Sequence, residues 1–489
     1  EGRGAVAVED RSTSQGTVKT ELRENAVGLP GMLMQGIATI APSFAILASF
    51  VFIVSNAGIV TPWAYVFGGA LLALQAVSAA QLAKVFPSAG GWYTWIARAL
   101  HPRAGFFAGV MFSIWLPPVG ALTLSFLAVT VLEPSIKAEY GVTIYWWLWV
   151  LAGLALVIYF AYQGIVLSEK ALIITGTIEI VIMVALAFTG LASPGPGGFS
   201  FAPLNPGNFG LATNLFLGVV FSIFAFSGWE STGPLAEESK NPKRNVPIGL
   251  VGSVIILMIY FAFVTWGYLV GIGVDKVAAT GNLNAPWPVA IFAQRVWSGA
   301  WVFLLFALLN SAIAVSIACF NGGTRTWYAM GRSGVLPTAL GKVNPAKKTP
   351  VNAIHLEVAV NVVAFACVLI WGVTDVFFTW ANVITLSLVL MYILANIGVI
   401  KYYLTEGRSQ FNVLLHVIIP VIASAAGIVV VWKSYFSPFT STGPVYWGLL
   451  VFIAVLVITI VALIYLRVTG KEGWMRKAQL VFEESGGGH

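Results

Sequence analysis

Long apolar stretches separated by short polar segments run along almost the whole chain. A stretch of about 20 apolar residues is long enough for one helix to cross a bilayer. Charged residues and Pro or Gly punctuation divide the chain into twelve such blocks. This pattern predicts an all-α polytopic membrane protein with twelve transmembrane helices, near residues 29–55, 59–85, 104–133, 144–163, 168–192, 211–237, 246–273, 297–331, 351–372, 375–402, 411–432 and 444–467.

The composition excludes a soluble globular protein. Apolar residues make up 58% of the 489 residues and charged residues only 9%, against about 25% charged in an ordinary soluble domain. The net charge of +7 does not indicate nucleic-acid binding, because no basic run is interleaved with aromatic residues in a polar segment. Cys319 and Cys367 both fall inside apolar blocks, so we expect packing residues rather than a disulfide or a metal site.

The basic residues predict the orientation of the chain in the membrane. All but four of the 26 Lys and Arg residues fall in the termini and in the loops on the same side as the termini; the four are Lys137, Lys276, Arg295 and Lys433. Because cytoplasmic loops are enriched in Lys and Arg, we expect a multi-pass protein of the cytoplasmic membrane with both termini in the cytoplasm. The expected tails are residues 1–28 and 468–489, the latter ending in a tag remnant, and the first block is a retained span, not a cleaved signal peptide.

Two blocks contain features that interrupt a helix in mid-membrane. In the first block, Pro42 follows small residues, removes a backbone donor and clashes with the preceding turn. In the sixth block, small residues precede Glu230, a carboxylate near the bilayer centre. We expect unwound backbone at about 38–42 and 225–229, facing each other around a central cavity. The alternative for Pro42 is a kink that serves only packing.

The two interrupted blocks lie five helices apart, so the chain passes through them in opposite directions. Paired interruptions at corresponding positions are typical of secondary transporters built from inverted repeats. The sequence therefore predicts repeats at about 29–192 and 211–402, followed by two further helices at 411–467.

Two more acidic residues fall within apolar blocks. Glu179 is too far from either end of the fifth block for its side chain to reach the interface, so it must face protein or water. Glu357 is nearer the inner end of the ninth block, and we expect it to pair with a Lys or Arg near the cytoplasmic interface.

Three motifs resemble loops of the amino acid-polyamine-organocation (APC) transporters. Residues 86–93 (FPSAGGWY) resemble that family's loop between helices 2 and 3, and residues 236–247 (AEESKNPKRNVP) resemble its loop after helix 6. Residues 330–337 (MGRSGVLP), followed by 342–344 and 349–351, resemble its helix 8 to 9 connection. The chain is similar in particular to the basic amino acid/polyamine antiporters and the putrescine importers of the family. The resemblance implies a LeuT-type fold, with helices 1–5 and 6–10 as inverted repeats and helices 11 and 12 peripheral.

The resemblance also implies roles for residues of helix 6. Residues 224–231 are similar to helix 6 of the arginine–agmatine antiporters of this family. By that match Phe224 is a gating aromatic against the substrate, Ser227 faces the substrate, and Glu230 is the position implicated in proton sensing. The alternative for Phe224 is an ordinary packing aromatic.

Two departures from the family pattern bear on the substrate. Where the family usually has a Gly-Ser-Gly type sequence, whose N–H groups hold the substrate carboxylate, this chain has Ile40, Ala41 and Pro42. The carboxylate grip is thereby weakened or shifted toward Ala41 and Ser43, which favours an amine while leaving amino acids open. Glu179 takes the place of a lysine on helix 5; it either exchanges a proton, pairs with a cationic substrate, or is a structural hydrogen-bond partner.

These arguments define a predicted site without a cofactor or a metal ion. Glu179 and Glu230 are the predicted proton-coupling residues. The facing helices 3, 8 and 10 are expected to contribute Thr123, Ser316, Cys319 and Trp380. The whole predicted substrate-binding set is Ala38, Thr39, Ile40, Ala41, Pro42, Ser43, Thr123, Phe224, Ala225, Phe226, Ser227, Gly228, Ser316, Cys319 and Trp380.

The predicted function is secondary active transport of amino acids, polyamines or other organic amines by alternating access. Proton-coupled import is favoured, and substrate exchange without net proton coupling is the alternative. A membrane enzyme is disfavoured because the four histidines are scattered and no Ser/His/Asp set or phosphate-binding loop is present. A transport-inactive sensor or subunit partner stays open. The expected partners are the substrate, protons and the lipid bilayer, with no nucleic acid, and the chain is expected to be a monomer or homodimer.

Overall fold

The computed structural model describes residues 22–277, 287–436, 443–470 and 473. Within these ranges the chain is helical almost throughout, and its only β pairings are isolated bridges between Val27 and Ser239 and between Asn344 and Thr349. The expected N-terminal tail up to residue 21 and most of the C-terminal tail, including the tag remnant, lie outside the described residues. The predicted all-α polytopic architecture is confirmed.

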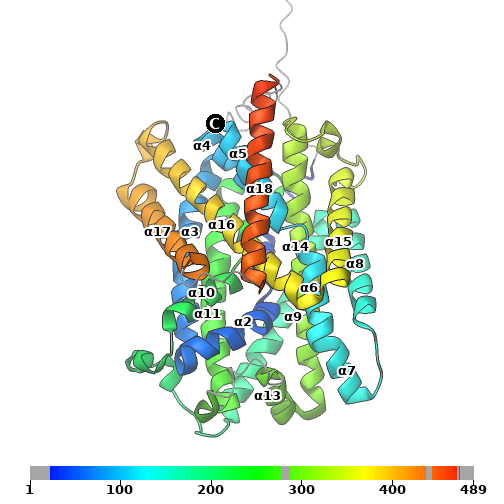
Figure 1. Cartoon of the computed structure of the whole chain (residues 1–489), viewed down its shortest axis with the longest axis vertical. Helices are drawn as coiled ribbons and strands as arrows, with labels where there is room; N and C mark the ends of the chain where they lie inside the picture. The colour runs from blue at the N-terminus through cyan, green and yellow to red at the C-terminus, as the bar shows by residue number, and fades with distance from the viewer. Residues whose placement is uncertain (1–21, 278–286, 437–442, 471–472, 474–489) are drawn as a thin grey trace, which may run out of the picture.

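The helices form an upright bundle in which α18 stands at the front and α17 at one edge (Figure 1). Their bounds are α1 Leu29–Ile40, α2 Pro42–Ala57, α3 Thr61–Val85, α4 Trp92–Ala99, α5 Pro102–Trp115, α6 Val119–Leu127, α7 Glu133–Tyr140, α8 Trp146–Gln163, α9 Ile165–Ala192, α10 Leu215–Ala225, α11 Pro242–Ile272, α13 Pro288–Trp297, α14 Val302–Arg332, α15 Val351–Trp371, α16 Val373–Leu404, α17 Ile419–Val431 and α18 Gly443–Val468. The 3-10 helices η5, Trp229–Glu238, and η8, Thr338–Gly341, complete the elements used below.

Each of the twelve apolar blocks coincides with helical segments of the structure. Eleven candidate spans occur in the described ranges, and the first, Leu29–Val85, contains two of the blocks. The third block is itself interrupted, since α5 ends at Trp115 and α6 begins at Val119 after Pro117 and Pro118. This third interruption was not predicted, although two consecutive prolines are its visible cause.

The predicted interruptions in blocks one and six are confirmed. α1 ends at Ile40, Ala41 adopts a left-handed conformation with φ of 56°, and α2 begins at Pro42. The break is narrower than expected, because residues 38–40 stay helical. α10 ends at Ala225, and after three non-helical residues the chain continues as η5.

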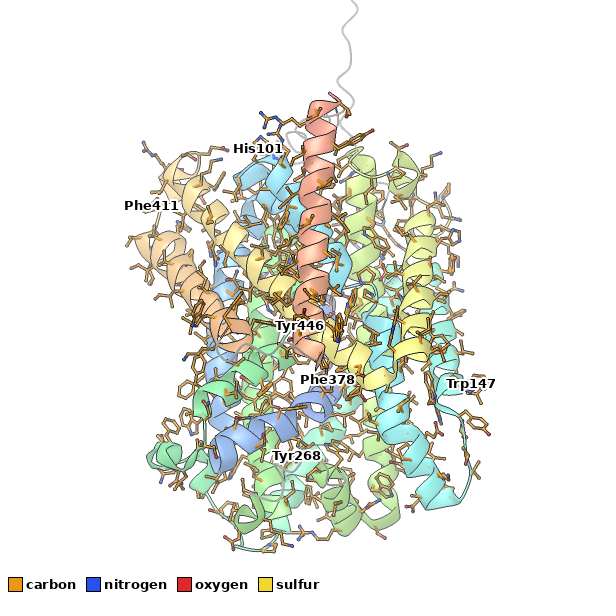
Figure 2. The ribbon with its side chains drawn as sticks, viewed as in Figure 1. His101, Trp147, Tyr268, Phe378, Phe411 and Tyr446 are labelled. Atoms are coloured by element: carbon orange, nitrogen blue, oxygen red, sulfur yellow. The ribbon has the colours of Figure 1, made fainter. Side chains whose placement is uncertain are left out.

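The outer surface of the bundle exposes many apolar side chains, as expected for contact with the lipid acyl chains. α18 exposes Val457, Ile458 and Val461, and α15 exposes Val362 and Val363. Figure 2 shows Trp147 at the outer edge of the bundle, pointing away from it, where α8 begins. Exposed apolar surface of this extent is typical of a membrane-facing perimeter with aromatic residues near the interface.

Both described ends of the chain lie at the same end of the bundle. The C-terminal end of α18 is at the top of Figure 1, the end at which α4 and α5 also lie. Near the N-terminal end, Leu22 packs with Ala89, just before α4, and with Tyr328 of α14. Val27 is fixed to the end of η5, because its N–H donates to the Glu238 carbonyl at 2.9 Å and its own carbonyl accepts from the Lys240 N–H at 2.9 Å.

Candidate functional site

A cavity of about 70 Å³ lies where the two broken helices meet. The breaks touch directly: a Cβ atom on Gly228 would lie only 2.5 Å from the backbone carbonyl of Thr39. The wall is mostly apolar and carries no ionised side chain. It is formed by Thr39, Ile40, Ala41, Phe44, Ala45, Ala48, Trp115, Val119, Leu122, Thr123, Phe224, Ala225, Ser227, Val315, Phe377, Trp380, Ala381 and Ile384.

The structure brings about half of the predicted substrate-binding residues to this cavity. Those in its wall are Thr39, Ile40, Ala41, Thr123, Phe224, Ala225, Ser227 and Trp380. Those outside the wall are Ala38, Pro42, Ser43, Phe226, Gly228, Ser316 and Cys319. Phe226 instead packs edge-on against Tyr65 and Phe261, and the Ser316 hydroxyl donates to the Ala312 carbonyl in its own helix.

Sequence reasoning missed ten wall residues: Phe44, Ala45, Ala48, Trp115, Val119, Leu122, Val315, Phe377, Ala381 and Ile384. For two groups of them the sequence contained a signal. Ala45 and Ala48 follow Ala41 at helical spacing, so the first break itself places them on one face of α2. Trp115 and Val119 flank the proline pair of the third block, which was the available signal for them.

The broken helices present their carbonyl ends to the cavity. α1 ends at Ile40 and α10 at Ala225, and both residues are in the wall. The C-terminal end of a helix carries a partial negative charge, which attracts cations. Two such ends meeting at one small cavity favour a positively charged group there.

The opposing N-terminal ends are already occupied by buried glutamates. At the start of α2 the Ser43 N–H donates to Glu179 Oε1 at 2.9 Å, and the Phe44 N–H donates to Ser311 Oγ at 3.2 Å. Before η5 the Gly228 N–H donates to Glu230 Oε2 at 2.7 Å. These donors would otherwise suit a substrate carboxylate, so the chain supplies its own carboxyl groups at both helix starts.

Each of these glutamates has a donor on its second oxygen as well. Asn310 Nδ2 donates to Glu179 Oε2 at 3.0 Å, and the Tyr392 hydroxyl donates to Glu230 Oε1. Tyr392 stacks on Trp229. Glu179 and Glu230 therefore hold the two breaks in place, whatever further role they have.

Two indole donors of the cavity wall have no acceptor. Within the described part of the chain, Nε1 of Trp115 and Nε1 of Trp380 are both buried without a hydrogen-bond partner. A buried indole N–H normally finds an acceptor. An acceptor on a bound substrate would satisfy both.

Ion pairs close the end of the bundle that holds both described chain ends. Arg325 of α14 binds Glu238 through two hydrogen bonds of 2.8 and 3.2 Å, and both side chains are almost fully buried. Arg332 binds Glu237 at 2.6 and 3.0 Å, and Glu237 also accepts the Ala89 N–H at 3.0 Å. The three sequence motifs thus meet at one place.

The expectation for Glu357 was wrong. Its side chain is 0% exposed, and it makes no ion pair or hydrogen bond with any described residue. The reason is that Glu357 lies on the face of α15 that packs against α14, so its carboxylate points at Gly323 and not toward the basic loop. A Cβ atom on Gly323 would come within 2.7 Å of Glu357 Oε2.

These features define a class of protein. An all-helical membrane fold in which two helices break beside a shared cavity is the architecture of a LeuT-type transporter. No group of three His, Cys, Asp or Glu residues that could hold a metal ion occurs in the ranges the structure describes.

The chain belongs to the amino acid permease family, whose family model matches residues 31–478. It is 23% identical over 398 residues to the branched-chain amino acid permease BcaP of Lactococcus lactis, covering 76% of this chain and 81% of that one. It is 22% identical over 406 residues to the low-affinity putrescine importer PlaP of Escherichia coli, covering 81% and 84%. It is 25% identical over 402 residues to the glutamate/serine transporter AimA of Bacillus subtilis, covering 76% and 70%. The protein is therefore a membrane permease and not an enzyme.

Proposed function

We propose that this permease is a secondary active transporter that carries a small substrate with an ammonium group, either an amino acid or a short amine, across the cytoplasmic membrane by alternating access. The arrangement of helix ends carries the proposal. The two carbonyl ends face the cavity, while Glu179 and Glu230 occupy the donors at the two opposing helix starts. An ammonium group is the substrate feature that this arrangement attracts.

The cavity also limits the rest of the substrate. A water molecule needs about 10–15 Å³ of such volume, so 70 Å³ holds about five to seven groups of that size. Trp115 and Trp380 offer N–H donors to a carboxylate, which makes a small amino acid as suitable as a short amine. The relatives are named for both classes, amino acids and putrescine.

We propose that the two predicted repeats, at about 29–192 and 211–402, move relative to each other during transport. The helices of 411–467 lie outside both repeats. The cavity lies between the first helices of both repeats. We assign the end sealed by Glu237 and Arg332 to the cytoplasm, which makes both termini cytoplasmic. Opening there requires η5 and α14 to separate.

Proton-coupled import is the proposed mode of energy coupling, with substrate exchange as the alternative. Glu179 and Glu230 lie at the two breaks that must move, so a proton bound to either would change a helix-end contact. Monomers and homodimers are both compatible with this mechanism, because the cavity lies within one chain.

Reconstituted protein tests the transport proposal. A thermal-shift screen of amino acids and polyamines identifies a ligand, since binding to the folded state raises its stability. Uptake of that labelled ligand into proteoliposomes follows. Phe224→Ala should impair uptake more than stability, and Ser227→Phe should abolish binding by filling the cavity.

Phe216→Ala is the matched control, because Phe216 lies on the same helix and is 44% exposed on its outer surface. We expect it to leave uptake unchanged. Wild-type uptake by both Phe224→Ala and Ser227→Phe would remove helix α10 and its break from the substrate site. Absence of uptake or exchange of any ligand by the purified wild-type protein would favour a transport-inactive sensor.

Carboxamide variants test the two glutamates at the breaks. If Glu179 exchanges the proton, Glu179→Gln should abolish the pH dependence of transport while substrate binding survives. If it holds a cationic substrate, the same change should abolish binding. Glu230→Gln is measured beside it, and wild-type behaviour of both variants at every pH would remove these two glutamates from coupling.

A further inference from the structure

We propose that Glu357 is a proton-binding site of this transporter, in addition to the two glutamates at the helix breaks. The proposal rests on the proton coupling proposed above. Its basis is the contrast among the buried carboxyl groups. Glu179 and Glu230 each have a donor on both oxygens, whereas neither oxygen of Glu357 has one in the described part of the chain.

A proton is the partner that this environment requires. A buried ionised carboxylate without a donor or a cation costs several kcal/mol or more, and the group avoids that cost by binding a proton. Glu357 is the seventh residue of α15, about 9 Å along the helix at 1.5 Å per residue. It is thus close enough to the proposed cytoplasmic surface for a modest opening to admit water.

The elements packed against α15 provide no cation for Glu357. On α14, Cys319 is a buried thiol and carries no positive charge, and Arg325 is bound to Glu238. On α8, Tyr162 lies against His355 instead. α6 and η8 carry no ionisable side chain. In the part of the chain that the structure describes, Lys342, which follows η8, forms no ion pair with Glu357. Asp375 is at the far end of α16.

Glu357 is connected to the cavity through α14. Gly323 faces the carboxylate, and the adjacent Gly322 faces η5, where a Cβ would lie 3.3 Å from Ser231 Cβ. The Ser231 hydroxyl is hydrogen-bonded to the Thr39 hydroxyl at 2.6 Å, and Thr39 is in the cavity wall. Two glycines therefore bring the carboxyl group within one helix thickness of the moving segment.

A second connection runs through Asn361, one turn further along α15. Its Oδ1 accepts the Ala121 N–H at 2.8 Å, and its Nδ2 donates to the Pro117 carbonyl at 2.9 Å. These bonds fix the interruption between α5 and α6, and Val119 next to it is in the cavity wall. A shift of α15 on ionisation of Glu357 would reach the cavity by this route as well.

The proton step is simple. Water on the side of higher acidity delivers a proton to the Glu357 carboxylate, giving the neutral acid, which allows α15 to pack closely on α14. When the cytoplasmic end opens, water reaches the group and the proton leaves to the cytoplasm. A proton from water on the other side then reaches the carboxylate through the cavity before α15 and α14 pack closely again, so that Glu357 is not buried in its ionised form. The proton enters on one side and leaves on the other, and no other reactant is consumed.

Glu357→Gln tests this site in proteoliposomes. Glutamine copies the neutral acid, so substrate counterflow without a gradient should stay within about twofold of wild type, whereas accumulation driven by an imposed proton gradient should fall about tenfold or more. The matched control is Glu406→Gln, which removes an exposed carboxylate and should change neither assay. Gradient-driven accumulation by Glu357→Gln at the wild-type level would overturn the proposal.

A second variant separates titration from shape and does not depend on the first one folding. Glu357→Asp keeps a carboxyl group in the same pocket and should retain gradient-driven accumulation with a displaced midpoint of the pH–rate profile. An unchanged midpoint would overturn the proposal.

The same assays on the wild-type protein distinguish failure of the Glu357 site from failure of proton coupling or of transport itself. Counterflow without any response to a proton gradient would overturn this site and proton coupling but leave exchange transport intact. Absence of counterflow would overturn the proposed transport function as well. Accumulation driven by a sodium gradient and lost in Glu357→Gln would overturn the proton assignment in favour of a cation.

Discussion

Gly228 lies at a close approach between the two broken helices. Its φ of 134° is a conformation that residues with a side chain rarely adopt, and a Cβ there would lie 2.5 Å from the carbonyl carbon and oxygen of Thr39. The backbone conformation and the lack of space for a Cβ atom thus both require glycine at this position. A single position thus sets how near the carbonyl end of α1 approaches η5.

We expect Gly228→Ala to abolish or strongly reduce transport, because the added methyl group must push the two breaks apart and strains the backbone by about 1–3 kcal/mol. Substrate uptake and the melting temperature of the purified variant check this. Gly299→Ala is the control, since no atom lies within 4 Å of the position its Cβ would take. Full uptake by Gly228→Ala would show that the close contact is not needed.

The residues of the site differ in how far the sequence predicts them. Phe224 and Ser227 were implied by the resemblance of residues 224–231 to helix 6 of the arginine–agmatine antiporters, and the structure places both in the cavity wall. The lack of a hydrogen-bond or ion-pair partner for Glu357 among the described residues was not predictable. It depends on which side of α15 faces α14, and on Gly323, which is 34 positions away in the sequence. Hydropathy shows that a carboxyl group is inside a block, but not which neighbours it meets.

At the scale of helices, hydropathy was sufficient to predict every span, and proline and small residues predicted the two main breaks. What hydropathy does not predict is which loops close the bundle. Glu238 and Arg325 are separated by 87 positions, and each by itself resembles an ordinary charged residue at a helix end. Their pairing exists only because η5 and α14 pack together.

Breaking the buried pair should be costly. Glu238→Gln leaves Arg325 as a buried charge without its carboxylate, which is expected to destabilise the closed form by about 3–5 kcal/mol. The melting temperature in detergent should fall accordingly. The double variant Glu238→Leu/Arg325→Met removes both charges and should recover most of the loss.

The exposed Arg408→Met serves as the control for loss of an arginine, because Arg408 only caps the Leu404 carbonyl. Equal melting temperatures for Glu238→Gln and the control would contradict a stabilising role for the pair. Additive losses in the double variant would show that the two side chains act independently.

For the molecule as a whole, the unequal distribution of Lys and Arg and the sealed end give the same orientation. The ion pairs, α4 and both described chain ends gather at one end of the bundle, and α7 and α13 lie at the other (Figure 1). The basic loops belong to the first end. By the positive-inside rule we expect that end to face the cytoplasm.

Single cysteines test this orientation in intact cells. With Cys367 replaced by serine, Glu406→Cys should be protected from a membrane-impermeant maleimide, whereas Glu139→Cys, exposed at the end of α7, should react. Cys319 is buried and should contribute little background. Lysed cells provide the control in which both sites react, and the reverse pattern in intact cells would invert the assignment.

The short pairing of Val27 with the end of η5 has a consequence for observing the transport cycle. Because the segment from Leu22 to Val27 is fastened to both η5 and α14, the cytoplasmic end cannot open without loosening it. Arg23 is exposed within this segment. Trypsin cleavage after Arg23 should therefore speed up when the carrier opens inward and slow down when it closes, which makes a protease a reporter of conformation.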